Sequence, residues 1–193
     1  MKSLNVMIVG VGGQGTLLAS RVLGAAMQAA GQDVKVSEVH GMSQRGGSVV
    51  TYVRAGEKVY SPIINQGEAD LILAFEQLEA ARWLPYLKKG GAVIVNSQEI
   101  DPMPVITGAA EYPEHILDKI KDQGVRLLTI DALSLALEAG SAKAANVVLI
   151  GMLSNHMDIP EEDWLAAIRE CVPEKFIDLN VKAFALGRAA DNA

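Results

Sequence analysis

Cysteine is nearly absent from this sequence, in which Cys171 is the one thiol. A disulfide needs two thiols, and an iron–sulfur cluster needs about four. The three histidines, His40, His115 and His156, lie far apart and lack the spacing of a metal site. We therefore expect no metal ion or cluster to be held by this chain alone.

Basic residues and long apolar runs are also scarce. The 17 Lys and Arg are outnumbered by 23 Asp and Glu, giving a net charge of -6 at pH 7, so general nucleic-acid binding is not expected. No apolar run reaches the ~20 residues of a membrane helix, and the N-terminus lacks the features of a signal peptide. We expect a cytoplasmic protein that acts on neither nucleic acid nor membrane.

Hydrophobic residues, by contrast, make up 50% of the chain. That share allows a sizeable core and leaves apolar surface for a partner. The length of 193 residues suits a single domain, so we expect one domain over residues 1–193.

The first two thirds of the sequence alternate strand-like and helix-like segments. The opening predicts a strand at Leu4–Val9, a glycine loop, a helix at Gln14–Ala30 ending at Gly31, and a strand at Val34–Val39. This order is that of a βαβ unit, whose crossover is right-handed.

Later segments complete an α/β pattern. Further strands are predicted at Ser48–Arg54, with a hairpin return at Lys58–Tyr60, and at Ala69–Phe75, Ala92–Asn96 and Val125–Ile130. Helices are predicted at Gln77–Lys88, Glu114–Asp122, Ala132–Ala139, Ala142–Met157, Glu161–Cys171 and Glu174–Ala190, with an irregular excursion at Asp101–Pro113. The pattern predicts a three-layer Rossmann-like α/β fold with a mostly parallel sheet, a hairpin after the second strand and a helical C-terminal third.

The segment Gly10-Val11-Gly12-Gly13-Gln14-Gly15 contains G-x-G-x-x-G between a predicted strand and a predicted helix. Glycines let a phosphate approach the backbone, and the free N–H groups and dipole of the helix N-terminus attract the anion. The candidate cofactor-binding residues are Gly10, Gly12, Gly13, Gln14, Gly15, Thr16, Gly46 and Gly47. Two alternatives remain: the glycines serve only tight turning and packing, or they bind NAD(P) with Glu38 on the ribose.

A second glycine cluster, Gly41-Met42-Ser43-Gln44-Arg45-Gly46-Gly47, is foreign to an ordinary dinucleotide fold. The candidate residues for an active-site rim are Glu38, His40, Ser43, Gln44 and Arg45. The Arg45 guanidinium suits a phosphate or carboxylate, although it could instead pair with Glu38 and brace the loop. We expect the cluster to be mobile in the isolated chain and ordered in a complex. No nucleophile elbow is present, and no catalytic set is assigned.

Both glycine motifs, with Ser48-Val49-Val50-Thr51 after the second, resemble the gamma subunit family of 2-oxoacid:ferredoxin oxidoreductases, and within it the indolepyruvate branch. The resemblance spans essentially the whole chain and keeps both motifs in order and separation. It implies a small accessory subunit of an enzyme that oxidatively decarboxylates 2-oxoacids to acyl-CoA and passes electrons to ferredoxin.

The resemblance also implies where the cofactors lie. Thiamine diphosphate, Mg²⁺ and 4Fe-4S clusters would sit on a large (alpha) partner subunit, and this chain would be inactive alone. Coenzyme A would be a ligand near the glycine loop. Two other interpretations stay open: a stand-alone NAD(P)- or flavin-dependent oxidoreductase, and a purely structural subunit whose loops touch no ligand.

Overall fold

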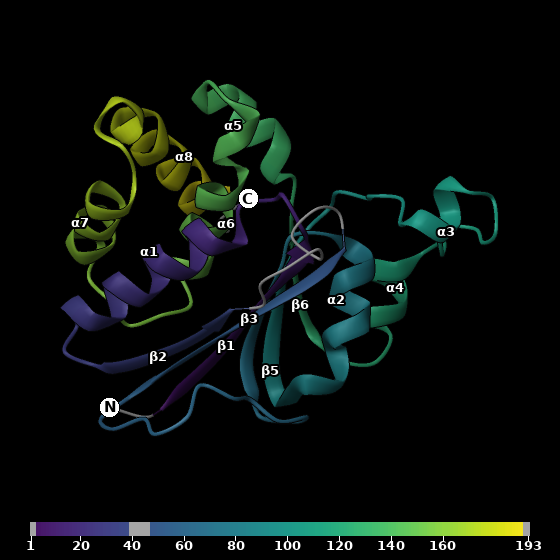
Figure 1. Cartoon of the computed structure of the whole chain (residues 1–193), viewed down its shortest axis with the longest axis horizontal. Coiled ribbons are helices and arrows are strands. Elements are labelled where there is room, and N and C mark those ends of the chain that lie inside the picture. The colour runs from purple at the N-terminus through teal and green to yellow at the C-terminus, as the bar shows by residue number, and fades with distance from the viewer. Residues whose placement is uncertain (1–2, 39–46, 191–193) are drawn as a thin grey trace.

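The computed structural model describes residues 3–38 and 47–190, which build a six-stranded sheet between two helix layers (Figure 1). The strands are β1 (Leu4–Val11), β2 (Asp33–Glu38), β3 (Ser48–Gly56), β4 (Ala69–Ala74), β5 (Leu87–Asn96) and β6 (Arg126–Ile130). Their order in the sheet is β2-β3-β1-β4-β5-β6. The neighbours β1, β4, β5 and β6 are parallel, which confirms the predicted mostly parallel sheet.

Helices cover both faces of this sheet, as the three-layer prediction requires. One face carries α1 (Thr16–Ala29), α5 (Ala132–Ala139), α6 (Ala145–Ser154), α7 (Glu161–Cys171) and α8 (Ile177–Ala190), and the other carries α2 (Gln77–Trp83) and α4 (Ile116–Lys121) (Figure 1). Within the described ranges, no helix has the length and apolar character to cross a bilayer.

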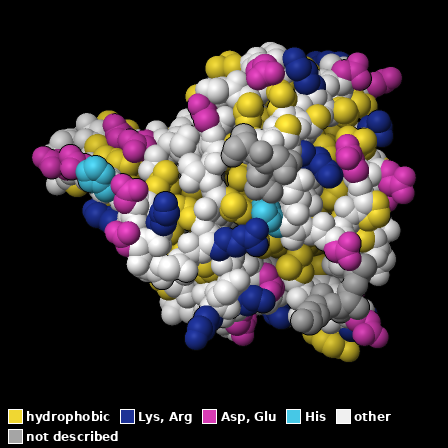
Figure 2. Space-filling model, turned by 180° about the vertical axis from the view of Figure 1, so that it is seen from behind, with side chains coloured by type: hydrophobic (Ala, Val, Ile, Leu, Met, Phe, Trp, Pro, Cys, Tyr) yellow, Lys and Arg dark blue, Asp and Glu magenta, His cyan; other side chains and the backbone are white. Residues whose placement is uncertain are grey.

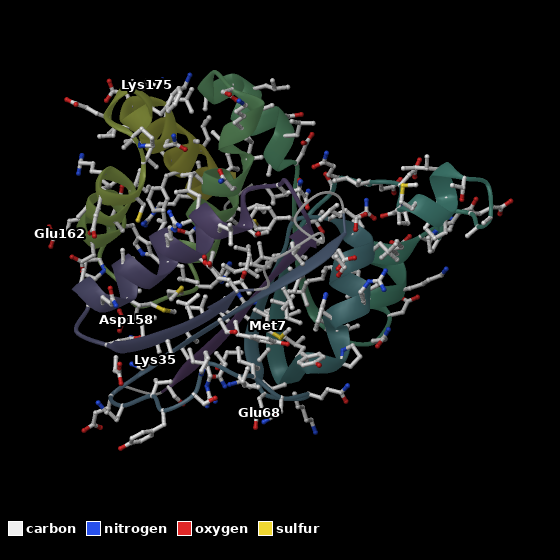
Figure 3. All side chains as sticks on the ribbon, in the orientation of Figure 1. Met7, Lys35, Glu68, Asp158, Glu162 and Lys175 are labelled. Atoms are coloured by element: carbon white, nitrogen blue, oxygen red, sulfur yellow. The ribbon has the colours of Figure 1, made fainter. Side chains whose placement is uncertain are left out.

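The two cores follow from the alternation of side chains along each strand. Val6 and Ile8 of β1 pack under the α1 layer, whereas Met7 and Val9 pack under the α2 layer. Successive residues of a strand point to opposite faces, so a strand buried on both sides is apolar throughout. In Figure 3, Met7 lies inside the molecule, whereas Lys175 lies at its surface.

Strand β3 departs from the simple βαβ order. It inserts between β1 and β2 and runs antiparallel to both. The antiparallel pairing after the second strand is therefore formed by β2 and β3 themselves. The prediction of a return strand at Lys58–Tyr60 was wrong, since residues 57–68 of the described chain contain no strand. The physical reason is that β3 already has a partner on each side, which leaves no edge for a hairpin return.

The helix predicted at Gln77–Lys88 and the strand predicted at Ala92–Asn96 meet five residues earlier than expected. Pro85 lies in a 3-10 turn directly after α2, and a proline cannot donate the N–H that would continue the helix. Strand β5 then starts at Leu87, with Gly90 at a φ of +81° where the register against β4 shifts.

The segment after β5 projects away from the sheet (Figure 1). We call residues 97–113 the arm. It carries the one-turn helix α3 (Met103–Ile106) within the excursion predicted as irregular. The arm leaves the carboxyl edge of the sheet, where β1 also ends and the glycine loop begins.

Candidate functional site

The glycine loop, Gly10 to Gly15, joins the carboxyl end of β1 to α1. Gly13 and Gly15 have φ values of +104° and +83°, which L side chains rarely adopt. A Cβ on Gly10 would lie 2.9 Å from the Phe75 Cβ, and one on Gly15 would lie 2.5 Å from the Asn146 Nδ2, so a side chain at either position would force a neighbour to move. A Cβ on Gly13 would meet nothing within 4 Å, so packing does not account for this glycine.

The start of α1 presents backbone donors that have no partner among the described residues. Gly15 occupies the N-cap position and supplies no side chain to the helix. Among the residues that the structure describes, the N–H groups of Gly13, Gly15, Thr16 and Leu17 donate no hydrogen bond. The first turn contains no acidic side chain. An anion placed here would meet both the free N–H groups and the positive end of the helix dipole.

A pocket of about 270 Å³ lies over this end of the helix and is lined by Gly12, Gly13, Gly15, Thr16, Leu17, Val49 and Thr51. Its lining includes four of the predicted cofactor-binding residues. A second hollow of about 300 Å³, lined by Ser20, Arg21, Val36 and Glu38, lies next to it, because Thr51 and Glu38 are partners in the β3–β2 ladder. Both hollows are lined in part by α1, by Thr16 and Leu17 in the first and by Ser20 and Arg21 in the second.

The two predicted loops meet at one hydrogen bond. The Gly12 N–H donates to the Gly47 carbonyl oxygen at 2.8 Å. Glu38 faces α1, where its Oε1 accepts a hydrogen bond from the Ser20 hydroxyl at 2.7 Å. The other rim candidates, His40, Ser43, Gln44 and Arg45, lie outside the described residues, as does Gly46. The predicted role of Arg45 on a phosphate or carboxylate, and its alternative as a brace on Glu38, therefore stay untested.

An amide cluster that the sequence analysis missed fixes the glycine loop to the sheet. The Gln14 Oε1 accepts from the Val11 N–H at 2.7 Å, and its Nε2 donates to the Phe75 carbonyl at 3.0 Å. The buried Asn96 donates to the same Phe75 carbonyl and accepts from the Ala132 N–H at 3.1 Å. These amides bind together the carboxyl ends of β1, β4, β5 and β6.

The cluster also reaches the base of the arm. Gln98 Oε1 lies 3.4 Å from the Gln14 Nε2 and 3.3 Å from the Asn96 Nδ2. The Gln98 carbonyl accepts from the Gln77 N–H at the start of α2. Because α1 covers one face of the sheet and α2 the other, the carboxyl ends of β1 and β4 form the switch point near which open α/β sheets bind ligands.

Two buried carboxylates stand beside this edge, with Glu76 1% and Glu79 4% exposed. Burial raises the pKa of Glu76, and the nearby Glu79 charge adds to that effect. Glu76 caps α2 by accepting from the Glu79 N–H at 2.9 Å, and it also accepts from the Ile100 N–H and the Tyr112 hydroxyl. Burial, and then this bond, raise the pKa of Tyr112 far above its ordinary value. Glu76 therefore ties the arm to α2.

Glu79 links α2 to the start of β3, directly after the second glycine cluster. It accepts hydrogen bonds from the Ser48 hydroxyl, from Arg82 Nε at 3.1 Å and from Trp83 Nε1 at 3.2 Å. Ser48 is the first residue of β3 and directly follows the second glycine cluster. A glutamate placed directly after a buried strand was the available signal for Glu76, since ligand sites gather at this edge, whereas Glu79 lies inside α2.

The described residues thus form an anion cradle held by amides and carboxylates.

Burial raises the pKa of the Cys171 thiol, which keeps it protonated within α7. In the part of the chain that the structure describes, no group of three or more His, Cys, Asp or Glu could hold a metal ion. The arrangement suits binding and positioning of an anionic ligand.

The sequence matches the family model described as pyruvate ferredoxin/flavodoxin oxidoreductase over residues 5–190. It is 50% identical over 194 residues to the indolepyruvate oxidoreductase subunit IorB of Thermococcus kodakarensis, covering 97% of this chain and 95% of that protein. The subunit of the same name from Pyrococcus horikoshii is 48% identical, with the same coverage.

Two solved structures share the fold. The gamma subunit of a keto/oxoacid ferredoxin oxidoreductase from Geobacter sulfurreducens has a TM-score of 0.73 at 23% identity, with 98% of each chain covered. The 2-oxoglutarate:ferredoxin oxidoreductase from Magnetococcus marinus, solved with 2-oxoglutarate, coenzyme A and succinyl-CoA bound, has a TM-score of 0.75 at 24% identity. The match covers 100% of this chain but 31% of that one, so there the fold is part of a longer polypeptide.

Proposed function

We infer the function of this chain from its family, because the chain belongs to the pyruvate ferredoxin/flavodoxin oxidoreductase family. We propose that it is the small subunit of an indolepyruvate:ferredoxin oxidoreductase. Such an enzyme oxidatively decarboxylates an aryl pyruvate, transfers the acyl group to coenzyme A and passes the electrons to ferredoxin. The observation that carries this proposal is the 50% identity, along almost the whole chain, to a subunit of that name.

The redox cofactors belong to a partner in this proposal. Thiamine diphosphate, Mg²⁺ and the 4Fe-4S clusters lie on the large (alpha) subunit, and ferredoxin is reached through the complex. The sequence supports this division, since one cysteine falls short of the about four thiolates that a cluster needs. The isolated small subunit is therefore inactive.

The glycine loop binds a phosphate of coenzyme A in this proposal. The N–H groups at the start of α1 that have no partner in the described part of the chain, the pocket beside them and the open space at Gly13 all fit a phosphate. The fold is also shared with a structure solved with coenzyme A bound. When bound, coenzyme A supplies the thiol that receives the acyl group, while the residues of this chain hold its phosphate.

The second loop completes the site. We assign Glu38, His40, Ser43, Gln44 and Arg45 to its rim, with Arg45 on a phosphate or carboxylate. The support is the hydrogen bond from Gly12 to Gly47, which puts the end of this loop against the glycine loop. Arg45→Ala in the assembled enzyme separates this role from a brace on Glu38, because only the first role lowers turnover without lowering the melting temperature.

A substitution in the pocket tests the coenzyme A assignment. Gly12→Val should raise the KM for coenzyme A in the assembled enzyme about tenfold or more. The valine side chain would crowd the bound phosphate, so that at least one charge-assisted hydrogen bond to it is lost. The KM for the 2-oxoacid should stay unchanged. Gly24→Ala, also on the α1 side but away from the pocket, is the matched control. An unchanged KM for coenzyme A would mean that the glycines serve packing alone. That result would favour a purely structural subunit.

A further inference from the structure

The arm is a folded segment that buries little of its own apolar surface. Its helix α3 closes with hydrogen bonds from the Ile106 N–H to the Pro102 carbonyl at 3.1 Å and from the Thr107 N–H to the Met103 carbonyl at 3.0 Å. Met103 and Ile106 are nevertheless 64% and 65% exposed. Three positions apart on a helix, they share one face.

The exposure of Met103 and Ile106 indicates that another protein surface covers them. Ordering a segment costs conformational entropy, which apolar burial normally offsets. Contiguous exposed apolar side chains rimmed by polar ones mark interaction sites. Figure 2 shows hydrophobic and acidic side chains gathered on the projection that the arm forms. The arm therefore has the character of a docking element.

The charges on and beside the arm restrict the partner. No Lys or Arg occurs between Gly90 and Asp118. The exposed acids of this stretch are Glu99, Asp101, Glu111 and Glu114. A matching surface must be basic around an apolar centre. A second copy of this chain, with a net charge of -6, is a poor match.

The base of the arm is held firmly and lies at the candidate site. Glu76 accepts from the Ile100 N–H at 3.3 Å and from the Tyr112 hydroxyl, so both ends of the arm are anchored to one buried side chain. Just before the first anchor, Gln98 contacts the Gln14 amide of the glycine loop. A surface presented on a fixed base loses little entropy on binding.

We propose that the arm is the docking element for the large, cofactor-carrying subunit, and that Met103 and Ile106 insert into apolar sockets rimmed by Lys and Arg. This inference rests on the proposed function, which supplies the partner. The exposed Leu133 and Leu137 of α5, which leaves β6 at the same edge of the sheet, extend the apolar contact. The partner is thereby brought against the edge that carries the glycine loop.

The test measures the Kd between this chain and the purified large subunit. Met103→Ser combined with Ile106→Ser should weaken binding about thirtyfold or more, as loss of two buried apolar anchors does at an interface. The matched control combines Tyr60→Ser with Ile63→Ser, since these side chains are 89% and 48% exposed in the segment at the opposite edge. The control should bind like the wild type.

Charge gives a second variant that does not alter the apolar face. Asp101→Asn combined with Glu111→Gln should slow association and flatten its dependence on ionic strength, with an unchanged melting temperature.

The outcomes separate the two claims. If the wild type does not bind the large subunit, the proposed function fails. If the wild type binds and the Met103/Ile106 variant binds equally well, the proposed function stands and the docking role of the arm is overturned. If sedimentation shows that this variant abolishes self-association and leaves the heteromer intact, the arm binds a second copy and the proposal is likewise overturned.

Discussion

Two glycines of the loop should respond differently to alanine. Both have positive φ, so each substitution costs about 1–2 kcal/mol of backbone strain. At Gly15 the new methyl would also displace the Asn146 amide, whose Nδ2 donates to the Gly15 carbonyl at 3.2 Å. Gly15→Ala should therefore lower the urea midpoint further than Gly13→Ala. Equal losses would show that Asn146 adapts freely and does not fix the loop.

The buried Glu76 predicts a pH dependence with a definite sign. Burial raises its pKa above the ordinary value of 4.5, so the folded state binds this proton more tightly than the unfolded state. Its stabilising contribution is present below that value and is lost as pH rises through the folded pKa. The melting temperature of the wild type minus that of Glu76→Gln should fall from pH 4.5 to pH 8. A difference that rises over this range would contradict the buried state of the carboxyl group.

At the level of elements, the contact between α6 and α8 depends on glycine. A Cβ on Gly187 would lie 1.9 Å from the Val148 carbonyl oxygen, so the helices touch backbone to backbone. Gly187→Ala should destabilise by about 1–3 kcal/mol, through overpacking. Gly24→Ala, whose Cβ would have ordinary contacts at 3.8 Å, should stabilise α1 by about 0.5–1 kcal/mol. Thermal denaturation of both variants checks the opposite signs.

Elements set by local pattern were predictable from the sequence. The bounds of α5 and α7 agree with the prediction, because capping residues and periodicity are local. The place of β3 between β1 and β2 was not predictable, since strand order depends on pairing between distant residues. The early end of α2 had a readable signal in Pro85, but the run of apolar residues at helical spacing outweighed it.

In the candidate site, too, the local motif could be predicted from the sequence and the contacts between distant residues could not. The glycine loop was recognisable because its residues are continuous in the sequence, whereas Asn96, Gln98 and Glu79 contribute contacts from other strands and helices. Nothing in their sequence neighbourhood indicates which loop they contact. The roles of the second glycine cluster stay predictions.

As a whole molecule, this chain combines an anion cradle with apolar and acidic surface at one edge of its sheet. We propose that the cradle binds and positions the ligand and that the projecting arm attaches the chain to its partner. Neither provides a group that oxidises a 2-oxoacid. We therefore propose that this chain completes a site on its partner.

The most direct test is reconstitution of activity from separated subunits. Indolepyruvate-dependent reduction of ferredoxin in the presence of coenzyme A would be measured for this chain alone, for the large subunit alone and for the two mixed. The account predicts no turnover with this chain alone, little with the large subunit and full turnover with the mixture. Turnover by this chain alone, or a full rate from the large subunit without it, would contradict the account.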